Sequence, residues 1–273
     1  MNEKRFDGRV NFAADDQTEA RLEEHFEKYS ITPNEIWKNF PIYARRVHLK
    51  RFLAHYELFR MIVDLPGDIL ELGVFRGTSL MSWANFLEIR CMGDRQRRVF
   101  GFDNFAGFTE IEEKDGAVSA QVDKVAGGFD PSGYEEMLRD AIQIYDADRF
   151  IPYKARVVLV KGDVEKTIPA FVAENPGIRL SLVHFDVDLY RPTLVALEHL
   201  CEIVPVEEQV ATQSVCAVVA LGYREDIAEH GEDTPIRARL AQADITGLLD
   251  HLAVYRLCPA CASPPRQRRR LKC

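Results

Sequence analysis

Short apolar runs alternate with stretches of helical periodicity through the middle of the chain, and this alternation limits the folds available to it. Helices are predicted over Thr78–Ile89, Val164–Glu174 and Pro192–Ile203. The apolar runs before and between these helices are Asp68–Val74, Val99–Phe102, Val157–Lys161 and Leu180–Phe185. Runs this short and this apolar are typical of parallel strands that are buried on both faces. The pattern predicts an α/β fold, a doubly wound sheet of the Rossmann-like type.

The segments outside this alternation predict the rest of the architecture. Residues 1–64 are expected to form an N-terminal helical cap, and residues 65–255 to form the cofactor-binding domain. Pro66 and Gly67 stop the last helix of the cap. The stretch 107–153 is too long for a simple connection, so we interpret it as a lid or substrate-binding insertion. It contains the glycine pair Gly127–Gly128, a candidate hinge, and a predicted helix over Tyr134–Tyr145. Farther on, a fifth strand is predicted within Val215–Leu221, a helix over Ile236–Leu252 and a disordered basic tail over 256–273.

The charge distribution argues against a nucleic-acid partner. The chain has 35 basic and 43 acidic residues. Its last stretch, Ser263–Cys273, holds five of the basic residues and none of the acidic ones, so the remainder has a net charge of −13. An acidic body is a poor surface for nucleic acid, and a terminal basic run is usually a solvated tail.

The apolar segments and the cysteines predict the compartment. No apolar run approaches the roughly 18 residues of a membrane span, and the first residues lack the pattern of a secretory signal. We therefore expect a cytoplasmic protein without a membrane partner, whose six scattered cysteines are reduced thiols. Cys258 and Cys261 have zinc-ligand or redox spacing, but no second pair follows them, so incidental thiols are favoured.

A glycine-containing strand-to-helix turn is the first candidate site element. In Asp68–Ser79, DILELGVFRGTS, a buried strand ends in Glu71-x-Gly73-x-x-x-Gly77 and opens directly into a helix. The glycines allow a sharp turn and close approach of a ligand, and the amides that follow Gly77, at Thr78 and Ser79, form a small anion site. A tight turn without a ligand would need the same glycines.

Acidic residues follow the next predicted strands. Asp103 ends VFGFD and can accept both hydroxyls of a ribose, and Asp163 follows VVLVKG and can reach an adenine amino group. Asp186 and Asp188 follow the fourth strand in LVHFDVDLY, where one carboxylate can turn toward a cofactor while the other binds a metal or takes a proton. Taken singly, each could be a loop or helix-capping carboxylate. Together with the glycine-containing turn, Asp103 and Asp163 point to an adenosine-containing ligand at the carboxyl ends of successive strands. His184, inside this strand, is expected to be a core histidine.

The segments ELGVFRGTS, GFDNFAGF, VKGD and FDVDLYRPTLVALEHL resemble the macrocin/mycinamicin-type sugar O-methyltransferases. The stretch Phe40–Gly77, FPIYARRVHLKRFLAHYELFRMIVDLPGDILELGVFRG, resembles the branch of dTDP-6-deoxyhexose 3-O-methyltransferases. The likeness extends over about Phe40–Leu200 and implies a class I methyltransferase that uses S-adenosylmethionine and Mg²⁺ on a sugar hydroxyl. It also implies the site residues. Glu71, Gly73 and Gly77 would line the methionine end of the cofactor, Asp103 would bind the ribose and Asp163 would lie near the adenine. Asp186 would also face the cofactor, and Asp188 would serve as catalytic carboxylate and metal ligand.

The chain departs from this family after its fourth strand. Where the family has an adjacent acidic pair that completes the metal site, this sequence has Gly222 and Tyr223, and the nearest carboxylates belong to Glu225 and Asp226. This departure keeps open a catalytically impaired protein that only binds the cofactor. An NAD-type sugar oxidoreductase or epimerase is the other alternative, disfavoured because the glycine spacing differs from Gly-x-Gly-x-x-Gly. A homo-oligomer is left open.

Overall fold

A six-stranded sheet forms the centre of the part of the chain that the computed structural model describes, namely residues 13–112, 115, 126–131, 133–203, 218–221 and 253–256. Its strand order is β3-β2-β1-β4-β5-β6. The strands are β1 (Asp68–Leu72), β2 (Val99–Asp103), β3 (Val157–Lys161), β4 (Leu180–Phe185), β5 (Val218–Leu221) and β6 (Ala253–Arg256). The first five run parallel, and β6 pairs antiparallel with β5. The predicted α/β class and all five predicted strands are confirmed.

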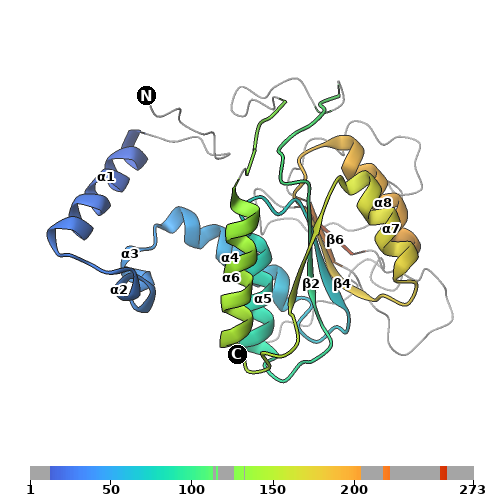
Figure 1. Ribbon diagram of the computed structural model, residues 1–273, viewed down its shortest axis with the longest axis horizontal. Helices are drawn as coiled ribbons and strands as arrows, with labels where there is room; N and C mark the ends of the chain where they lie inside the picture. The colour runs from blue at the N-terminus through green and yellow to red at the C-terminus, as the bar shows by residue number, and fades with distance from the viewer. Residues whose placement is uncertain are drawn as a thin grey trace, which may run out of the picture.

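Helices cover both faces of the sheet (Figure 1). On one face lie α4 (Arg46–Arg60), α5 (Thr78–Arg90) and α6 (Tyr134–Asp148), and on the other α7 (Val164–Glu174) and α8 (Tyr190–Ile203). Each face has its own apolar core: Trp83 and Phe86 belong to the first, Phe171 and Val183 to the second. Strand β1 lies between β2 and β4 and is buried along its whole length. Successive strands are added on one side of β1 up to β3 and on the other side from β4 onward, so the strand order reverses direction between β1 and β4.

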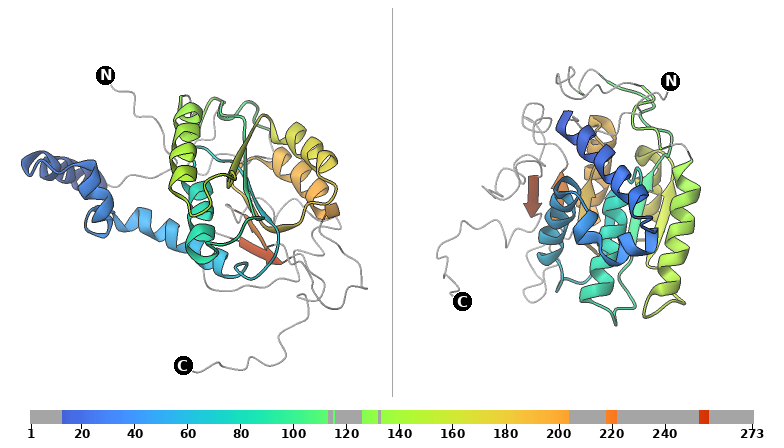
Figure 2. Two further views of the ribbon diagram at one scale, coloured as in Figure 1. Left: turned by 60° about the horizontal axis from the view of Figure 1, so that its bottom comes forward. Right: turned by 90° about the vertical axis from the view of Figure 1, so that its left-hand side faces the viewer.

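The N-terminal segment is helical, as expected, but most of it lies away from the sheet. Helices α1 (Ala13–Lys28), α2 (Pro33–Lys38) and α3 (Phe40–Tyr43) extend outward, and only α4 reaches the body (Figures 1 and 2). Helix α4 packs on α5 through Phe52, Tyr56 and Phe59, whose ring centroids lie 4.9, 5.2 and 5.6 Å from that of Phe86. The boundaries assigned to a separate cap stay a prediction.

The stretch 107–153 consists of two different parts. Its second part is α6, which packs on α5: the Tyr145 hydroxyl donates to the Ala84 carbonyl (2.7 Å), and Arg149 pairs with Glu88 (3.1 Å). Its first part is closed at the base, where main-chain hydrogen bonds join Phe108 to Gly127 and Gly128. The hypothesis of a lid is therefore restricted to the first part, and it stays a prediction. The helix expected over Ile236–Leu252 and the tail 256–273 lie outside the described residues, apart from Arg256.

A buried polar cluster crosses the first core. The Glu71 carboxylate is fully buried and accepts hydrogen bonds from the Ser79 hydroxyl (2.6 Å) and the Trp83 indole (2.7 Å). His184, its neighbour across the β1–β4 pairing, places Nδ1 3.5 Å from Glu71 Oε2, which is an ion-pair distance rather than a short hydrogen bond. Burial alone would lower the pKa of His184, but the carboxylates of Glu71 and Asp186 outweigh it and raise that pKa. His184 is confirmed as a core residue.

His55 completes this cluster from α4. Its ring lies 4.9 Å from that of Trp83 and 5.4 Å from that of His184, and its side chain is almost fully buried. Desolvation, aided by the nearby positive charges of His184 and Arg51, lowers the pKa of His55 to about 2. His55 is therefore neutral in the folded protein, whereas in the unfolded chain it titrates at its ordinary value of about 6.5.

This difference predicts how His55 acts on stability at acidic pH. Below the unfolded pKa, protons bind the unfolded chain and not the folded one, so His55 lowers the free energy of unfolding by up to about 1.4 kcal/mol per pH unit as the pH falls. We expect His55→Phe, which keeps a ring on Trp83, to lose less stability than the wild type between pH 6.5 and 5. Urea titrations at both pH values measure this. His25→Phe, at an exposed position on α1, is the control and should follow the wild type. Parallel pH dependence in His55→Phe and wild type would contradict the assignment.

Candidate active site

The predicted site residues gather at the edge of the sheet where the parallel strands end. Gly73, Asp103, Asp163 and Asp186 each follow or terminate a strand on this side. Main-chain hydrogen bonds tie these strand ends together: Gly73 donates to Phe102, and Gly162 donates to Asp103, both at 2.9 Å. The site thus lies beside the reversal of strand order at β1, the usual ligand position in an open α/β sheet.

Gly73 brings the turn after β1 into direct contact with the end of β4. It has φ of +91°, and a Cβ built there would collide with the carbonyl oxygen of Asp186. The Asp186 amide also donates to the Leu72 carbonyl (2.7 Å). Only glycine fits both the backbone angle and the close approach. This contact sets the candidate cofactor turn against the acidic loop.

Glu71 lies beneath this turn rather than at its surface. Its carboxylate accepts hydrogen bonds from the Ser79 hydroxyl and the Trp83 indole, so the Ser79 hydroxyl points toward Glu71. These two hydrogen bonds tie β1 to the first turns of α5. The predicted contact of Glu71 and Ser79 with a cofactor stays a prediction, and the described contacts support a role of both residues in shaping the turn.

Asp103 holds the same turn from the other side. Its Oδ2 accepts from the amides of Val74 (2.7 Å) and Phe75 (2.8 Å), and its Oδ1 accepts from Phe105 (2.7 Å). Phe75 and Phe105 have φ of +52° and +54°, which is unusual for bulky residues and costs on the order of 1–3 kcal/mol each. Asp103 stabilises both strained residues. A carboxylate offers about four acceptor positions, so Oδ1 retains one for a ligand hydroxyl.

The start of α5 offers main-chain donors at this edge. Gly77, at φ of +82°, is its N-cap residue and supplies no side-chain cap; Thr78 follows and is exposed. The first amides of a helix attract an anion such as an amino-acid carboxylate.

Asp163 is placed differently, as the N-cap of α7. Its carboxylate accepts a hydrogen bond from the Glu165 amide (3.0 Å) and lies 3.4 Å from Lys166. Its predicted position near an adenine is not tested by these contacts.

The loop after β4 carries the remaining two acids. Asp186 accepts a hydrogen bond from Arg51 of α4 at 2.6 Å. Asp188 is only partly buried and has φ of +58°, a left-handed conformation that Asp and Asn tolerate better than other side chains. Strained residues of this kind concentrate at functional sites.

Two partners of this loop could not be recognised from the sequence. Arg51 lies among the apolar residues of α4 without any motif, and Asp115 lies in the insertion. Asp115 is buried, and its Oδ1 accepts from the amide of Tyr190 (2.6 Å) while Oδ2 accepts from Glu112 (2.6 Å). The insertion thereby reaches the first residue of α8. Phe129, whose ring centroid lies 5.7 Å from that of Phe75, links it to the cofactor turn as well.

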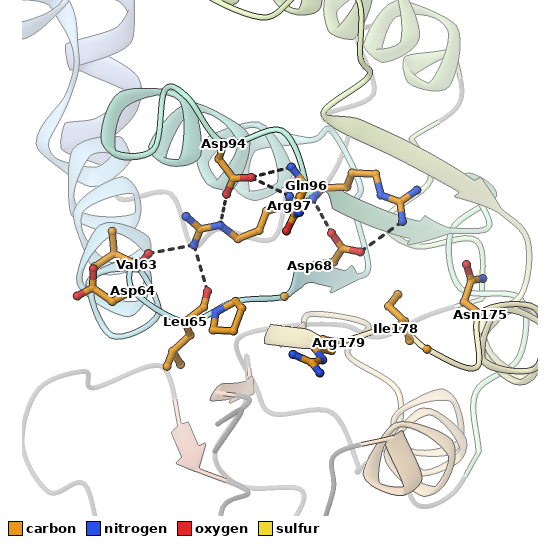
Figure 3. Close-up of a pocket in the computed structure, with 14 residues that line it drawn as sticks. Val63, Asp64, Leu65, Asp68, Asp94, Gln96, Arg97, Asn175, Ile178 and Arg179 are labelled. Atoms are coloured by element: carbon orange, nitrogen blue, oxygen red, sulfur yellow. Dashed lines mark hydrogen bonds and ion pairs between the residues drawn. The ribbon is translucent and has the colours of Figure 1, made fainter. Parts of the chain in front are cut away.

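A separate cavity lies at the opposite edge of the sheet. It has a volume of about 710 Å³ and is lined where β1, β2 and β4 begin, by Asp68, Arg98 and Arg179 among others (Figure 3). Asp68 accepts from the Arg98 amide at 2.6 Å, and Arg97 donates to the carbonyls of Val63 and Leu65. These ion pairs and hydrogen bonds are internal to the structure, and none of the predicted site residues lines the cavity.

The metal site can be tested in part. Within the described ranges, no group of three or more His, Cys, Asp or Glu side chains is arranged to hold an ion. The Asp188 carboxylate is an oxygen donor of the kind that magnesium prefers, and one or two carboxylates plus waters are often sufficient. Its role as a metal ligand stays a prediction. Gly222, Tyr223, Glu225 and Asp226 lie outside the described residues.

Comparisons with known proteins show the family to which this chain is similar. The family described as Macrocin-O-methyltransferase (TylF) matches residues 16–249. The 8-demethyl-8-(2,3-dimethoxy-alpha-L-rhamnosyl)-tetracenomycin-C 4'-O-methyltransferase of Streptomyces olivaceus is 30% identical over 184 residues, which are 62% of this chain. The chain spans 61% of the length of that relative.

Solved methyltransferase structures are similar to this chain over most of its length. The crystal structure of CalS11, a calicheamicin methyltransferase, is similar with a TM-score of 0.74 and 28% identity, over 91% of this chain and 94% of that one. The apo structure of CalS11, described as a TDP-rhamnose 3'-O-methyltransferase, has a TM-score of 0.68 and 26% identity over 91% and 96%. The O-methyltransferase NovP, at 22% identity and a TM-score of 0.53 over 76% and 79%, shares the fold.

The fold is that of the class I Rossmann-like methyltransferases. The resemblance seen in the sequence is confirmed, and the family match covers far more than half of the residues. The chain belongs to the macrocin O-methyltransferase (TylF) family.

Proposed function

We propose that this chain is an S-adenosylmethionine-dependent O-methyltransferase that acts on a hydroxyl of a nucleotide-linked deoxysugar or glycoside. The observation that carries the proposal is the contact between Gly73 and Asp186, which brings the cofactor turn against the acidic loop. Family membership and the sugar methyltransferases among its relatives support the substrate class. The NAD-type and non-catalytic alternatives are not favoured by these relatives.

The residues of the cofactor turn fit S-adenosylmethionine. The uncapped first amides of α5 suit its carboxylate, and the remaining acceptor position of Asp103 suits a ribose hydroxyl. We place Gly73, Gly77, Thr78 and Ser79 around the methionine end of the cofactor. Glu71 contributes there by accepting the hydrogen bond of the Ser79 hydroxyl. Asp163 is placed near the adenine. When bound, the cofactor supplies an electrophilic methyl group on a positively charged sulfur.

Asp188 is the proposed catalytic carboxylate. Methyl transfer forms a bond between the sugar oxygen and the methyl carbon while the carbon–sulfur bond breaks, and the hydroxyl proton must leave. Asp188 accepts this proton as general base. Its carboxylate would also hold Mg²⁺, which when bound would lower the pKa of the sugar hydroxyl. Asp186, paired with Arg51, holds the loop beside the cofactor turn.

The reaction is proposed to take place in the cytoplasm on a small sugar substrate, without a nucleic-acid or membrane partner. The acidic composition supports the first exclusion. Among the helices that the structure describes, none is long and apolar enough to cross a membrane.

Calorimetric titration with S-adenosylmethionine and with NAD tests the cofactor class. We expect binding of the former and none of the latter. Asp103→Ala should weaken binding about 10- to 100-fold, because a charged hydrogen-bond partner and the support of two strained phenylalanines are lost together. Asp140→Ala, on the exposed face of α6, should bind like wild type. Tight binding of NAD without a response to S-adenosylmethionine would refute the proposal.

Asp188→Asn tests the catalytic carboxylate. Asparagine tolerates the left-handed backbone, so the loop keeps its shape while the base and the anionic donor are removed. With a TDP-linked deoxysugar as substrate, we expect turnover to fall at least 100-fold and S-adenosylmethionine affinity to stay unchanged. Asp148→Asn, exposed on α6, is the control. Wild-type turnover should also vanish with a chelator and return with millimolar magnesium. Full activity in Asp188→Asn would exclude this role, and indifference to chelation would exclude the metal.

A further inference from the structure

The loop that carries Asp188 is fixed on both sides of this residue by side chains from remote segments. Before it, the Asp186 carboxylate accepts from Arg51 Nη2 at 2.6 Å. After it, the Tyr190 amide donates to Asp115 Oδ1 at 2.6 Å. Asp188 lies midway between these fixed points, so a shift at either of them would redirect its carboxylate.

The backbone of Asp188 gives these contacts their importance. Its φ of +58° is an unfavoured conformation, which persists only where the surroundings impose it. The contacts to Arg51 and Asp115 span 135 and 75 positions of the sequence. One comes from α4 and the other from the insertion, so neither follows from the local course of β4 or α8.

The two contacts differ in exposure and in their expected contribution to overall stability. The Arg51 side chain is 54% exposed, and an ion pair so exposed contributes little to the stability of a whole protein. Asp115 is 5% exposed, and its two oxygens accept main-chain amides of Tyr190 and Glu112. It therefore joins the base of the insertion to the end of the acidic loop.

We propose that Arg51 and Asp115 are positioning residues that hold Asp188 in its left-handed conformation and aim its carboxylate at the sugar hydroxyl. This inference rests on the proposed function, since it assigns Asp188 to the reacting hydroxyl. Through Asp115, the insertion is joined to the end of the catalytic loop, and through Arg51 the helix α4 contributes to catalysis without contacting the reacting atoms.

The test compares Arg51→Gln and Asp115→Ala with a matched control, Arg60→Gln. Arg60 lies on the same helix, has a similarly exposed side chain and pairs with Glu57 (2.9 Å). Both test variants should lower kcat on the order of tenfold, the size expected when a reacting group is slightly misplaced, with KM for S-adenosylmethionine close to wild type. Tm should stay close to wild type in Arg51→Gln and fall in Asp115→Ala, which removes the acceptor of two main-chain amides. Arg51→Lys, which keeps the charge, should recover part of kcat. Arg60→Gln should match the wild type.

A second measurement does not depend on turnover. Hydrogen exchange of the peptide amides over 186–190, followed by mass spectrometry, should accelerate in Arg51→Gln and Asp115→Ala and stay unchanged in Arg60→Gln. If Asp115→Ala does not fold, Asp115→Asn replaces it. The amide oxygen of Asn still accepts from Tyr190, so exchange should lie between wild type and Arg51→Gln.

The outcomes separate this inference from the proposed function. Exchange over 186–190 that is equal in Arg51→Gln, Asp115→Ala and Arg60→Gln would overturn the inference even if the wild type transfers methyl groups. In Arg51→Gln, a loss of kcat that comes with an equal loss of S-adenosylmethionine affinity and of Tm would also overturn it, because Arg51 would then be merely structural. Accelerated exchange in variants of a wild type that methylates no sugar would refute the proposed function and leave the anchoring of the loop in place.

Discussion

The rest of this structure depends on the hydrogen bonds and the ion pair that surround the buried carboxylate of Glu71. A buried charge is costly unless it is paired and hydrogen-bonded. Glu71 meets this condition only where Ser79 and Trp83 of α5 and His184 of β4 surround it. The requirement fixes α5 against β1 and β1 against β4. Both the turn at Gly73 and the loop at Asp186 begin directly after these strands.

Most of the fold could be predicted from the sequence, because fully buried parallel strands are short and apolar and their helices have a clear period. The bounds of β3, β4 and α7 agree with the prediction, and β1, β2 and α5 differ from it by no more than two residues. The antiparallel β6 was not predicted, since four residues at the edge of a sheet carry no distinctive periodicity. The gathering of Gly73, Asp103 and Asp186 at one edge was also predictable, because the carboxyl ends of parallel strands must meet there.

The partners of these residues could not be predicted in the same way. Sequence spacing indicates which strand a carboxylate follows, but not which distant side chain it meets. From the sequence, Asp103 was expected to bind a ribose, which stays a prediction. The structure shows that its carboxylate accepts hydrogen bonds from the amides of two strained phenylalanines, which the sequence did not indicate. Arg51, His55 and Asp115 come from segments whose contacts depend on how helices and loops pack in three dimensions. Asp115 stands among charged and small residues of the insertion, which give no periodic signal.

The left-handed backbone of Asp188 limits how this protein can be altered. Glutamate has the same charge and donor atoms, but it lacks the short side chain that makes a positive φ tolerable. A carboxylate at this position must therefore be aspartate, and the neutral replacements that keep the backbone are asparagine and glycine, neither of which can take up a proton. Under the proposed function, Asp188 is therefore a position that variants aimed at a different sugar must keep.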